Sequence, residues 1–187
     1  FDVVPLEREG LSGVKLPGML LLFQQQEPTG PSPGTVMDHF GLKVRSRAEV
    51  LERWRAAGLE VQAEFNDVEG FPNAYLGAPD GIRIELQEDD NPSAKAAGHH
   101  LHWILPNNLE LRTWYLETFS VRGSKRGRLD TADLPGMNLS FMAPFRPGPD
   151  KVTTKGRAID HIGFEVRNLA DFCKQLEAKG IEFDEPY

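Results

Sequence analysis

Histidine is the residue type in this sequence most suited to chemistry, and all five histidines fall in three similar short segments. The segments read DHFGLKV, HHLHWIL and DHIGFEV. Aligning their starts puts His39, His100 and His161 in the same slot. Because imidazole binds transition metals and titrates near neutral pH, a histidine recurring in one slot predicts a metal site or an acid-base site.

The alternation in these segments predicts β-strands with one apolar face. In the first segment Phe40, Leu42 and Val44 share one face, which leaves His39 on the other. When the apolar face of such a strand packs on a helix, the opposite face borders solvent or a cleft. We therefore expect the recurring histidines to line a cleft.

A carboxylate is expected to join these histidines. In PDGIRIELQE the apolar residues alternate with Glu85, which places its side chain on the face away from the core. Two imidazoles and one carboxylate bind Fe, Mn, Zn or Ni and leave positions open for substrate. His102, two residues after His100, should project to the same face as a general base, whereas His99 should point to the other face.

Composition restricts the partners of the chain. It has 187 residues and a net charge of −7, which argues against a nucleic-acid backbone as partner. The basic stretch SVRGSKRGR at 120–128 is interpreted as a solvated loop, and the single cysteine, Cys173, as a core residue. Nothing approaches 18 consecutive apolar residues, so no membrane span is expected, although GMLLLF predicts a buried strand.

The start of the sequence, FDVVPLEREG, lacks an initiator methionine and a signal-peptide pattern. We expect an upstream segment that is processed away or absent from this sequence. A cytoplasmic location is expected, with a processed or exported form as the alternative.

The chain also repeats itself. LPGMLLLF from Leu16 matches LPGMNLSF from Leu134, and each is followed by a connector rich in Pro and Gly and then by Asp-His. Periodicity predicts one β-α-β-β-β unit with strands at 38–44, 59–65, 73–76 and 82–87 and a helix at 46–58. A second unit starts at His99, with its helix near 109–119, and a third starts at Asp160 and lacks its last two strands. Residues 1–26 are typical of the tail of such a unit.

These units, the first-strand histidines, the helix ending in WYLETF and the closing PDGIRIEL resemble the vicinal oxygen chelate superfamily. That superfamily includes glyoxalase I, bleomycin-resistance proteins and type I extradiol dioxygenases, and the resemblance covers nearly the whole chain. It implies an α+β fold in which repeated βαβββ units pair into open, barrel-like, eight-stranded clefts around a divalent metal. Carried over, the metal-ligand positions are His39, Glu85, His100 and His161.

The last strands depart from the full ligand pattern that this resemblance implies. Where a further ligand would fall, one copy has Leu22 and the other has Ser140. This difference argues against the two-His, two-Glu set of glyoxalase I and leaves the two-His, one-carboxylate set of the extradiol enzymes.

Two pairings of the units are open. If 38–88 pairs with 99–143, then His39, Glu85 and His100 form a complete triad. In the other pairing His100 meets His161, and the missing ligands would come from outside this sequence.

The repeated LPGM segments favour the second pairing. It implies two tandem glyoxalase-like domains at 1–88 and 98–187, joined by a linker at about 89–97, with the first lacking its start and the second its end.

The function expected from these features is that of a metal-dependent enzyme acting on a small substrate with vicinal oxygens. Lyase, isomerase and extradiol-type dioxygenase chemistry all fit, with His102 or Glu165 moving a proton. The alternative is a non-catalytic protein that binds a small molecule, as bleomycin-resistance proteins do. The expected partners are a small-molecule substrate and a second copy in a homodimer, without nucleic acid or membrane.

Overall fold

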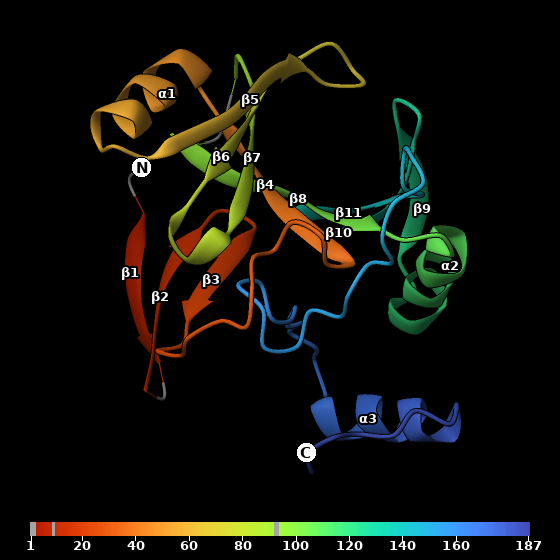
Figure 1. Ribbon diagram of the computed structural model, residues 1–187. Coiled ribbons are helices and arrows are strands. Elements are labelled where there is room, and N and C mark those ends of the chain that lie inside the picture. Colours follow the sequence, from red (N-terminus) through yellow and green to blue (C-terminus); the bar gives the residue numbers. More distant parts are fainter. Residues whose placement is uncertain (1–2, 9, 92–93) are drawn as a thin grey trace.

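The computed structural model describes residues 3–8, 10–91 and 94–187, and its main feature is one large curved sheet (Figure 1). The sheet is built from β4 (Met37–Val44), β5 (Glu60–Asn66), β6 (Pro72–Gly77), β7 (Arg83–Glu88), β8 (Ala96–Ile104), β9 (Arg122–Arg126), β10 (Leu129–Leu134) and β11 (Met137–Met142). Its order is β5-β6-β7-β4-β8-β11-β10-β9, with eight strands. The outer strands β5 and β9 do not pair, so the barrel is open. This confirms the predicted α+β class with an open eight-stranded sheet.

The sheet has two halves of the same topology. One half consists of β4, α1 (Arg47–Ala56), β5, β6 and β7, and the other of β8, α2 (Asn108–Phe119), β9, β10 and β11. The first strands β4 and β8 run antiparallel at the centre, and each is flanked by the parallel last strand of its own half. This is the first of the two pairings that the sequence left open. The pairing that the LPGM repeat favoured, in which His100 meets His161, is not formed in the described part of the chain.

Local sequence explains the helix that follows β4. Ser46 caps α1 by accepting a hydrogen bond from the Glu49 amide, and Gly58, with φ of +73°, lies just beyond its end. Val50 and Leu51 are buried against the sheet. The short 3-10 helix η1 (Pro79–Gly81) leads into β7 in the same half.

Helix α2 covers the equivalent surface of the second half. Its Tyr115 is buried, with ring centroids 5.8 Å from Trp103 of β8 and 5.7 Å from Phe141 of β11. Aromatic pairs at this separation add to the burial of apolar area. The apolar core therefore lies between the sheet and its helices, and the inner face of the sheet is left for polar groups.

A separate three-stranded sheet precedes the large one. It contains β1 (Val4–Arg8), β2 (Leu11–Leu16) and β3 (Met19–Phe23) in the order β1-β2-β3. The strand predicted at GMLLLF is present as β3, but its burial was predicted wrongly. Among the described residues β3 pairs only with β2, and Leu20 and Leu22 are 47% and 51% exposed.

The third copy of the histidine segment forms no strand, contrary to prediction. Residues 160–166 have no strand partner in the described part of the chain. Phe164 packs on α2, with its ring centroid 4.2 Å from that of Phe119, whereas His161 and Glu165 are exposed.

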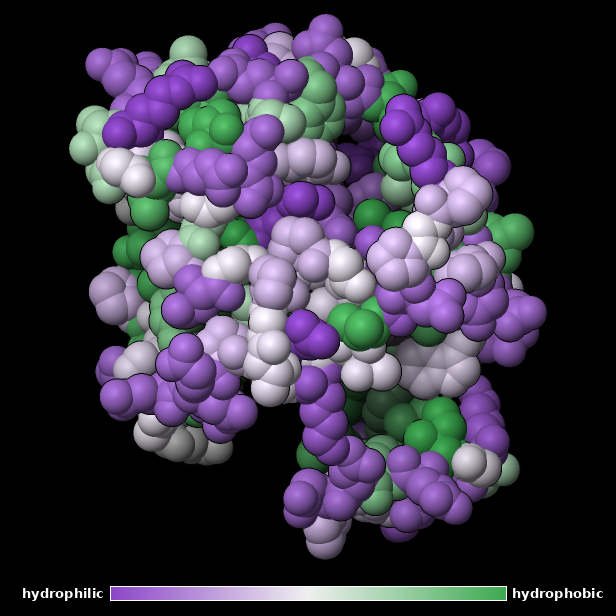
Figure 2. Space-filling model, viewed as in Figure 1, coloured by the Kyte–Doolittle hydropathy of each residue, from purple (hydrophilic) through white to green (hydrophobic). Residues whose placement is uncertain are grey.

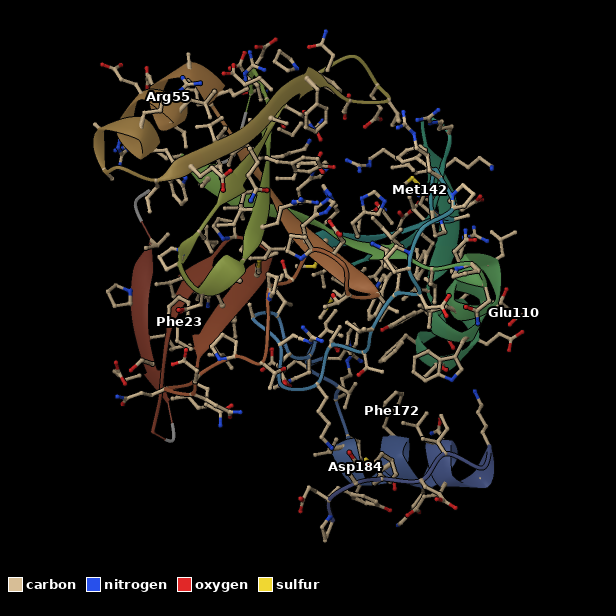
Figure 3. The ribbon with its side chains drawn as sticks, in the orientation of Figure 1. Phe23, Arg55, Glu110, Met142, Phe172 and Asp184 are labelled. Atoms are coloured by element: carbon tan, nitrogen blue, oxygen red, sulfur yellow. The ribbon has the colours of Figure 1, made fainter. Side chains whose placement is uncertain are left out.

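The last helix follows this segment. Helix α3 (Leu169–Ala178) begins after Asn168, whose side chain accepts a hydrogen bond from the Asp171 amide. As expected, Cys173 is buried. In Figure 1 α3 lies apart from the large sheet, and Phe172, labelled in Figure 3, points back toward α2.

The large sheet includes residues of the predicted linker and of the predicted solvated loop. Strand β8 begins at Ala96, so the large sheet continues across the predicted linker at 89–97. The division of the protein into tandem domains stays a prediction. The solvated loop predicted at 120–128 is wrong, because this stretch contains β9 and the turn that leads into β10.

No helix in the ranges that the structure describes is long and apolar enough to cross a membrane.

Candidate metal centre

Four side chains from three strands converge on the inner face of the large sheet. They are His39 of β4, Glu85 of β7, and His100 and His102 of β8. One nitrogen or oxygen atom of each lies within 4.8 Å of those of the others. All four residues are buried, with exposures between 0% and 6%. Because β4 and β8 are central neighbours, the pairing of the two halves itself brings these side chains together.

Gly41 makes room for one of the imidazoles. In the sheet register it lies opposite both Glu85 and His100. A Cβ atom at Gly41 would lie 2.3 Å from Cε1 and 2.4 Å from Nδ1 of His100. Any residue with a Cβ would therefore push this ring away, and the sequence meets the close approach with glycine.

Glu85 lies at the centre of the cluster. Its Oε2 is 2.8 Å from Nε2 of His39 and 3.5 Å from Nε2 of His100. Its other oxygen accepts a hydrogen bond from Nδ2 of Asn73 at 2.5 Å. The same Nε2 of His39 also lies 3.3 Å from Nδ1 of His102.

Two β-bulges supply the groups that orient the histidines. The register between β4 and β8 shifts at Asp38 and again at His99, so each of these residues is an extra residue in its strand. A bulged residue does not follow the simple alternation of faces. Asp38 thereby reaches Nδ1 of its neighbour His39 at 2.9 Å, and Nδ1 of His99 lies 3.1 Å from Nδ1 of His100.

The contact between Asp38 and His39 is supported by further charges. Arg83 donates to Asp38 at 3.0 Å, and the amine of Lys151 lies 3.8 Å from the same carboxylate. Burial by itself would raise the pKa of Asp38, but the hydrogen bond from His39 and the nearby cations lower it to about 2. Burial also opposes a charge on His39, yet its hydrogen bonds to Asp38 and Glu85 raise the pKa of this imidazole.

The other imidazoles are held neutral. Burial lowers the pKa of His100 to about 4 and takes the pKa of His102 well below its usual value. Burial would raise the pKa of Glu85, but the neighbouring imidazoles of His100 and His39 bring it below its usual range. At neutral pH the cluster therefore offers two neutral imidazoles and a carboxylate, which are the forms that bind a metal.

The donor set fits a divalent metal ion. The Nε2 atoms of His100 and His102 are buried and have no hydrogen-bond partner among the residues that the structure describes. Buried polar atoms left without a partner are costly and rare. A cation bound to Nε2 of His100 would satisfy that nitrogen and leave the Nε2 of His102 free beside it. The His39 Nε2, with Nδ1 bound to Asp38, has the arrangement typical of an oriented histidine ligand.

The last strand of the second half offers no carboxylate. Ser140 of β11 lies opposite His102 in the register and donates its hydroxyl to the Asn138 side chain at 2.9 Å. The nitrogen-rich part of the cluster therefore comes from β8, which contributes two histidines.

The cluster borders a cleft of about 530 Å³, a volume in the usual range of small-molecule sites. Glu85 and His102 reach its surface, and its apolar lining includes Phe65, Met142 and Phe145. The space-filling view shows the surface hollowed between β5 and β9 (Figure 2), and Figure 3 labels Met142 on the β9 side. A larger hollow of about 840 Å³ at residues 177–187 contains none of the cluster residues.

Two residues predicted to act at the site lie elsewhere. The structure brings neither His161 nor Glu165 to the cluster, because 160–166 pairs with no described strand. His161 contacts Asp160 at 2.7 Å, and its side chain is 78% exposed. The roles of His161 as a ligand and of Glu165 as a proton carrier stay predictions.

Sequence reasoning missed several supporting residues. An aspartate directly precedes the histidine in two of the three segments, and this recurrence was the signal that could have identified Asp38. His99 was expected on the opposite face because strict alternation does not allow for a bulge. No signal in the sequence distinguished Asn73 from an ordinary strand residue.

Comparison with known proteins places the fold. No family model matches the sequence, and no curated protein matches it. A glyoxalase I variant from Zea mays has a TM-score of 0.51 at 10% identity, over 70% of this chain and 54% of the other. A protein from Bacillus subtilis, provisionally described as a dioxygenase, has a TM-score of 0.52 at 13% identity, over 70% and 50%.

A methylmalonyl-CoA epimerase from Mycobacterium tuberculosis gives a TM-score of 0.44 at 17% identity, over 66% of this chain and 93% of the other. The chain spans about half the length of the first two structures. These two likenesses show that the chain has the vicinal oxygen chelate fold, in agreement with the sequence motifs.

Proposed function

We propose that the protein is a divalent-metal-dependent enzyme that acts on a small substrate bearing two neighbouring oxygens. The observation that supports this function best is the buried, unpartnered Nε2 of His100 next to a central carboxylate and a second imidazole. In this proposal His39, Glu85 and His100 hold the ion, and the adjoining cleft admits the substrate. A bound divalent ion would act as a Lewis acid toward the substrate oxygens.

The other residues then have separate tasks. Asp38 holds the proton of His39 on Nδ1, and His99 fixes the ring of His100. Asn73 fixes one oxygen of Glu85. His102 reaches the cleft, is neutral and has a free Nε2, so it would accept a proton from the substrate and return it.

The same arrangement supports lyase, isomerase or extradiol-type dioxygenase chemistry. A redox-active ion such as Fe(II) or Mn(II) is required only for the reaction with dioxygen. A protein that sequesters a small molecule in this cleft without metal is the alternative, and metal content separates the two functions.

The direct test is elemental analysis of protein purified without chelator or nickel affinity resin, followed by reconstitution with Fe(II), Mn(II), Zn(II) or Ni(II). We expect near-stoichiometric metal, a higher melting temperature in its presence, and turnover within a panel of catechols and 2-oxoaldehydes. A protein that neither carries nor takes up any of these ions would overturn the proposal in favour of metal-free sequestration.

The role of His102 has its own test in the variant His102→Gln. If His102 moves a proton, the variant keeps its metal and loses turnover. Loss of the metal itself would assign His102 to the ligand set instead.

A further inference from the structure

A half-buried cation on the wall of the cleft, Arg126, has no anionic partner among the described residues, whereas Arg128 on the same wall is exposed and lies over the ring of Phe145. Arg126 is the last residue of β9, lies in the basic stretch 120–128, and borders the same cleft as Glu85 and His102. Its side chain is half-buried, and its Nε is buried without a hydrogen-bond partner. Burying part of a guanidinium without an opposite charge is costly unless another group compensates it.

Within the described residues, the hydrogen-bond contacts of the Arg126 side chain are with Gln87 and His99, neither of which is an anion. Its NH1 donates to Oε1 of Gln87 at 3.2 Å and lies 3.4 Å from the imidazole of His99. An imidazole is either neutral or positively charged, so His99 offers no negative charge to offset the guanidinium. No carboxylate among the described residues lies within 4 Å of Arg126.

Other cations of the same strand are paired. Arg122 lies 3.3 Å from Asp133, and Lys125 lies 3.1 Å from Asp130. Both side chains are mostly exposed, at 84% and 66%, so these ion pairs contribute little to stability. The less exposed Arg126 is therefore the member of β9 without a counter-ion.

The carboxylates that line the cleft are engaged elsewhere. Glu85 is held by His39 and Asn73. Oδ1 of Asp67 accepts hydrogen bonds from the backbone amides of Glu69 and Phe71, both at 2.9 Å, and so holds its own turn. Its Oδ2 is buried without a hydrogen-bond partner among the described residues, but it lies more than 4 Å from the guanidinium of Arg126.

The wall that carries Arg126 is fixed by contact between two hairpin turns. Gly127, with φ of +55°, approaches the β5–β6 turn so closely that a Cβ there would lie 2.8 Å from Cγ2 of Val68. The tips of the two turns face each other in the upper part of Figure 1. Arg126 is thereby held at a set position relative to the metal cluster, which suits recognition better than a mobile surface side chain.

We infer that Arg126 binds a carboxylate of the substrate, so that the substrate is a small carboxylic acid with an apolar body. Its carboxylate lies against the guanidinium and its apolar body against side chains such as Phe65 and Met142. The placement of its neighbouring oxygens at the metal cluster rests on the proposed function, whereas the carboxylate contact does not.

The test compares acids with their amides in metal-free protein. Benzoate, phenylacetate and 3-phenylpropanoate are titrated by calorimetry beside benzamide, phenylacetamide and 3-phenylpropanamide, since these pairs differ in charge and little in shape. We expect the wild-type protein to prefer at least one acid over its amide. Arg126→Gln should weaken binding of that acid by about 10- to 100-fold, the usual effect of losing a charged hydrogen bond, and leave the amide unchanged.

Two further variants separate recognition from a structural role. Arg126→Lys keeps the positive charge but cannot donate two parallel hydrogen bonds to a carboxylate, so it should retain part of the preference for the acid that Arg126→Gln loses. Arg122→Gln removes an exposed cation from the same strand and should bind every probe as the wild type does. If Arg126→Gln fails to fold, Arg126→Lys decides the question instead, because a folded lysine variant with a reduced preference for the acid would still support the inference.

The inference is overturned if the wild-type protein shows no preference for any acid, including by failing to bind the probes. It is also overturned if Arg126→Gln weakens acid and amide equally. Metal content, measured on the same samples, reports on the proposed function independently. A protein without metal that still prefers the acid through Arg126 would refute the enzyme proposal and keep the carboxylate site.

Discussion

In DHFGLKV and in DHIGFEV the aspartate contacts the ring of the histidine that follows it. Asp38 lies 2.9 Å from Nδ1 of His39, and Asp160 lies 2.7 Å from Nδ1 of His161. Each aspartate also accepts a hydrogen bond from a glycine amide four residues earlier. Yet His39 is 1% exposed and the His161 side chain 78% exposed.

The difference lies in what surrounds each copy. DHFGLKV is paired on one side with β7, which contributes Glu85, and on the other with β8, which contributes His100. DHIGFEV has no strand partner among the described residues. The local sequence is therefore enough to orient a histidine, but only neighbouring strands turn it into part of a ligand set.

The largest effect should come from removing the two histidines in turn. His39→Ala deletes a ligand, so metal affinity should fall by about 100-fold or more, beyond the typical loss from an outer partner. His161→Ala should leave the affinity unchanged because no other ligand-type residue of the cluster is near it. Titration with Zn(II) against a competing chelator measures both. Equal losses in the two variants would contradict the assignment of the site to the first copy.

The glycines at the fourth position of each heptad give the second comparison. A Cβ at Gly41 would collide with His100, whereas a Cβ at Gly163 would meet nothing within 4 Å. Gly41→Ala should lower the free energy of unfolding by about 1–3 kcal/mol through overpacking, and also weaken metal binding by displacing the ring. Gly163→Ala should change stability by no more than about 0.5 kcal/mol. Chemical denaturation of the metal-free proteins tests the pair, and similar values for both would be inconsistent with the packing of His100 over β4.

The aspartates give a smaller contrast. Asp38→Asn keeps the shape of the side chain but removes the charge that orients and polarises His39, so metal affinity should fall by about 10- to 100-fold. Asp160→Asn changes the same local contact around His161, away from the cluster, and should have no effect on the affinity. If Asp38→Asn leaves the metal affinity unchanged, the bulge at Asp38 affects the structure of the sheet and not metal binding.

The elements that could be predicted from sequence are those set by local pattern. Ser46 and Gly58 mark the ends of α1, and the alternation around His39 and Glu85 assigns their faces correctly. The three-residue set His39, Glu85 and His100 was named, but the choice between two pairings depends on contacts far apart in sequence, and the repeat favoured the pairing that the described residues do not form.

The missed features share a physical cause. Bulges at Asp38 and His99 break the two-residue period on which face assignments depend. The role of Arg126 was missed because it lies in a basic stretch whose charge suggested solvent exposure, although Arg126, Gly127 and Arg128 of this stretch line the cleft. Such placements depend on strand register, which single-sequence periodicity does not specify.

The last effect expected is the acid response of the metal-free protein, measured with chelator present. The folded pKa of Asp38 is about 2, below the ordinary 3.8, so its contribution to stability is complete above pH 4 and is lost as the pH falls toward 2. His39 stays protonated across this window because its pKa is raised, and therefore it does not mask the response. The wild-type free energy of unfolding should drop by about 2 kcal/mol more than that of Asp38→Asn between pH 4 and pH 2.

Asp160 provides the matched control for this response. The hydrogen bond from the Gly156 amide, followed by the contact with His161, lowers its pKa too, but its side chain is 42% exposed and its interactions are screened by water. Asp160→Asn should therefore follow the wild-type acid curve in urea denaturation at each pH. If Asp38→Asn and Asp160→Asn reduce the pH dependence of stability equally, the buried surroundings of Asp38 and His39 add nothing to the contact between them. The difference proposed between the two heptads would then be wrong.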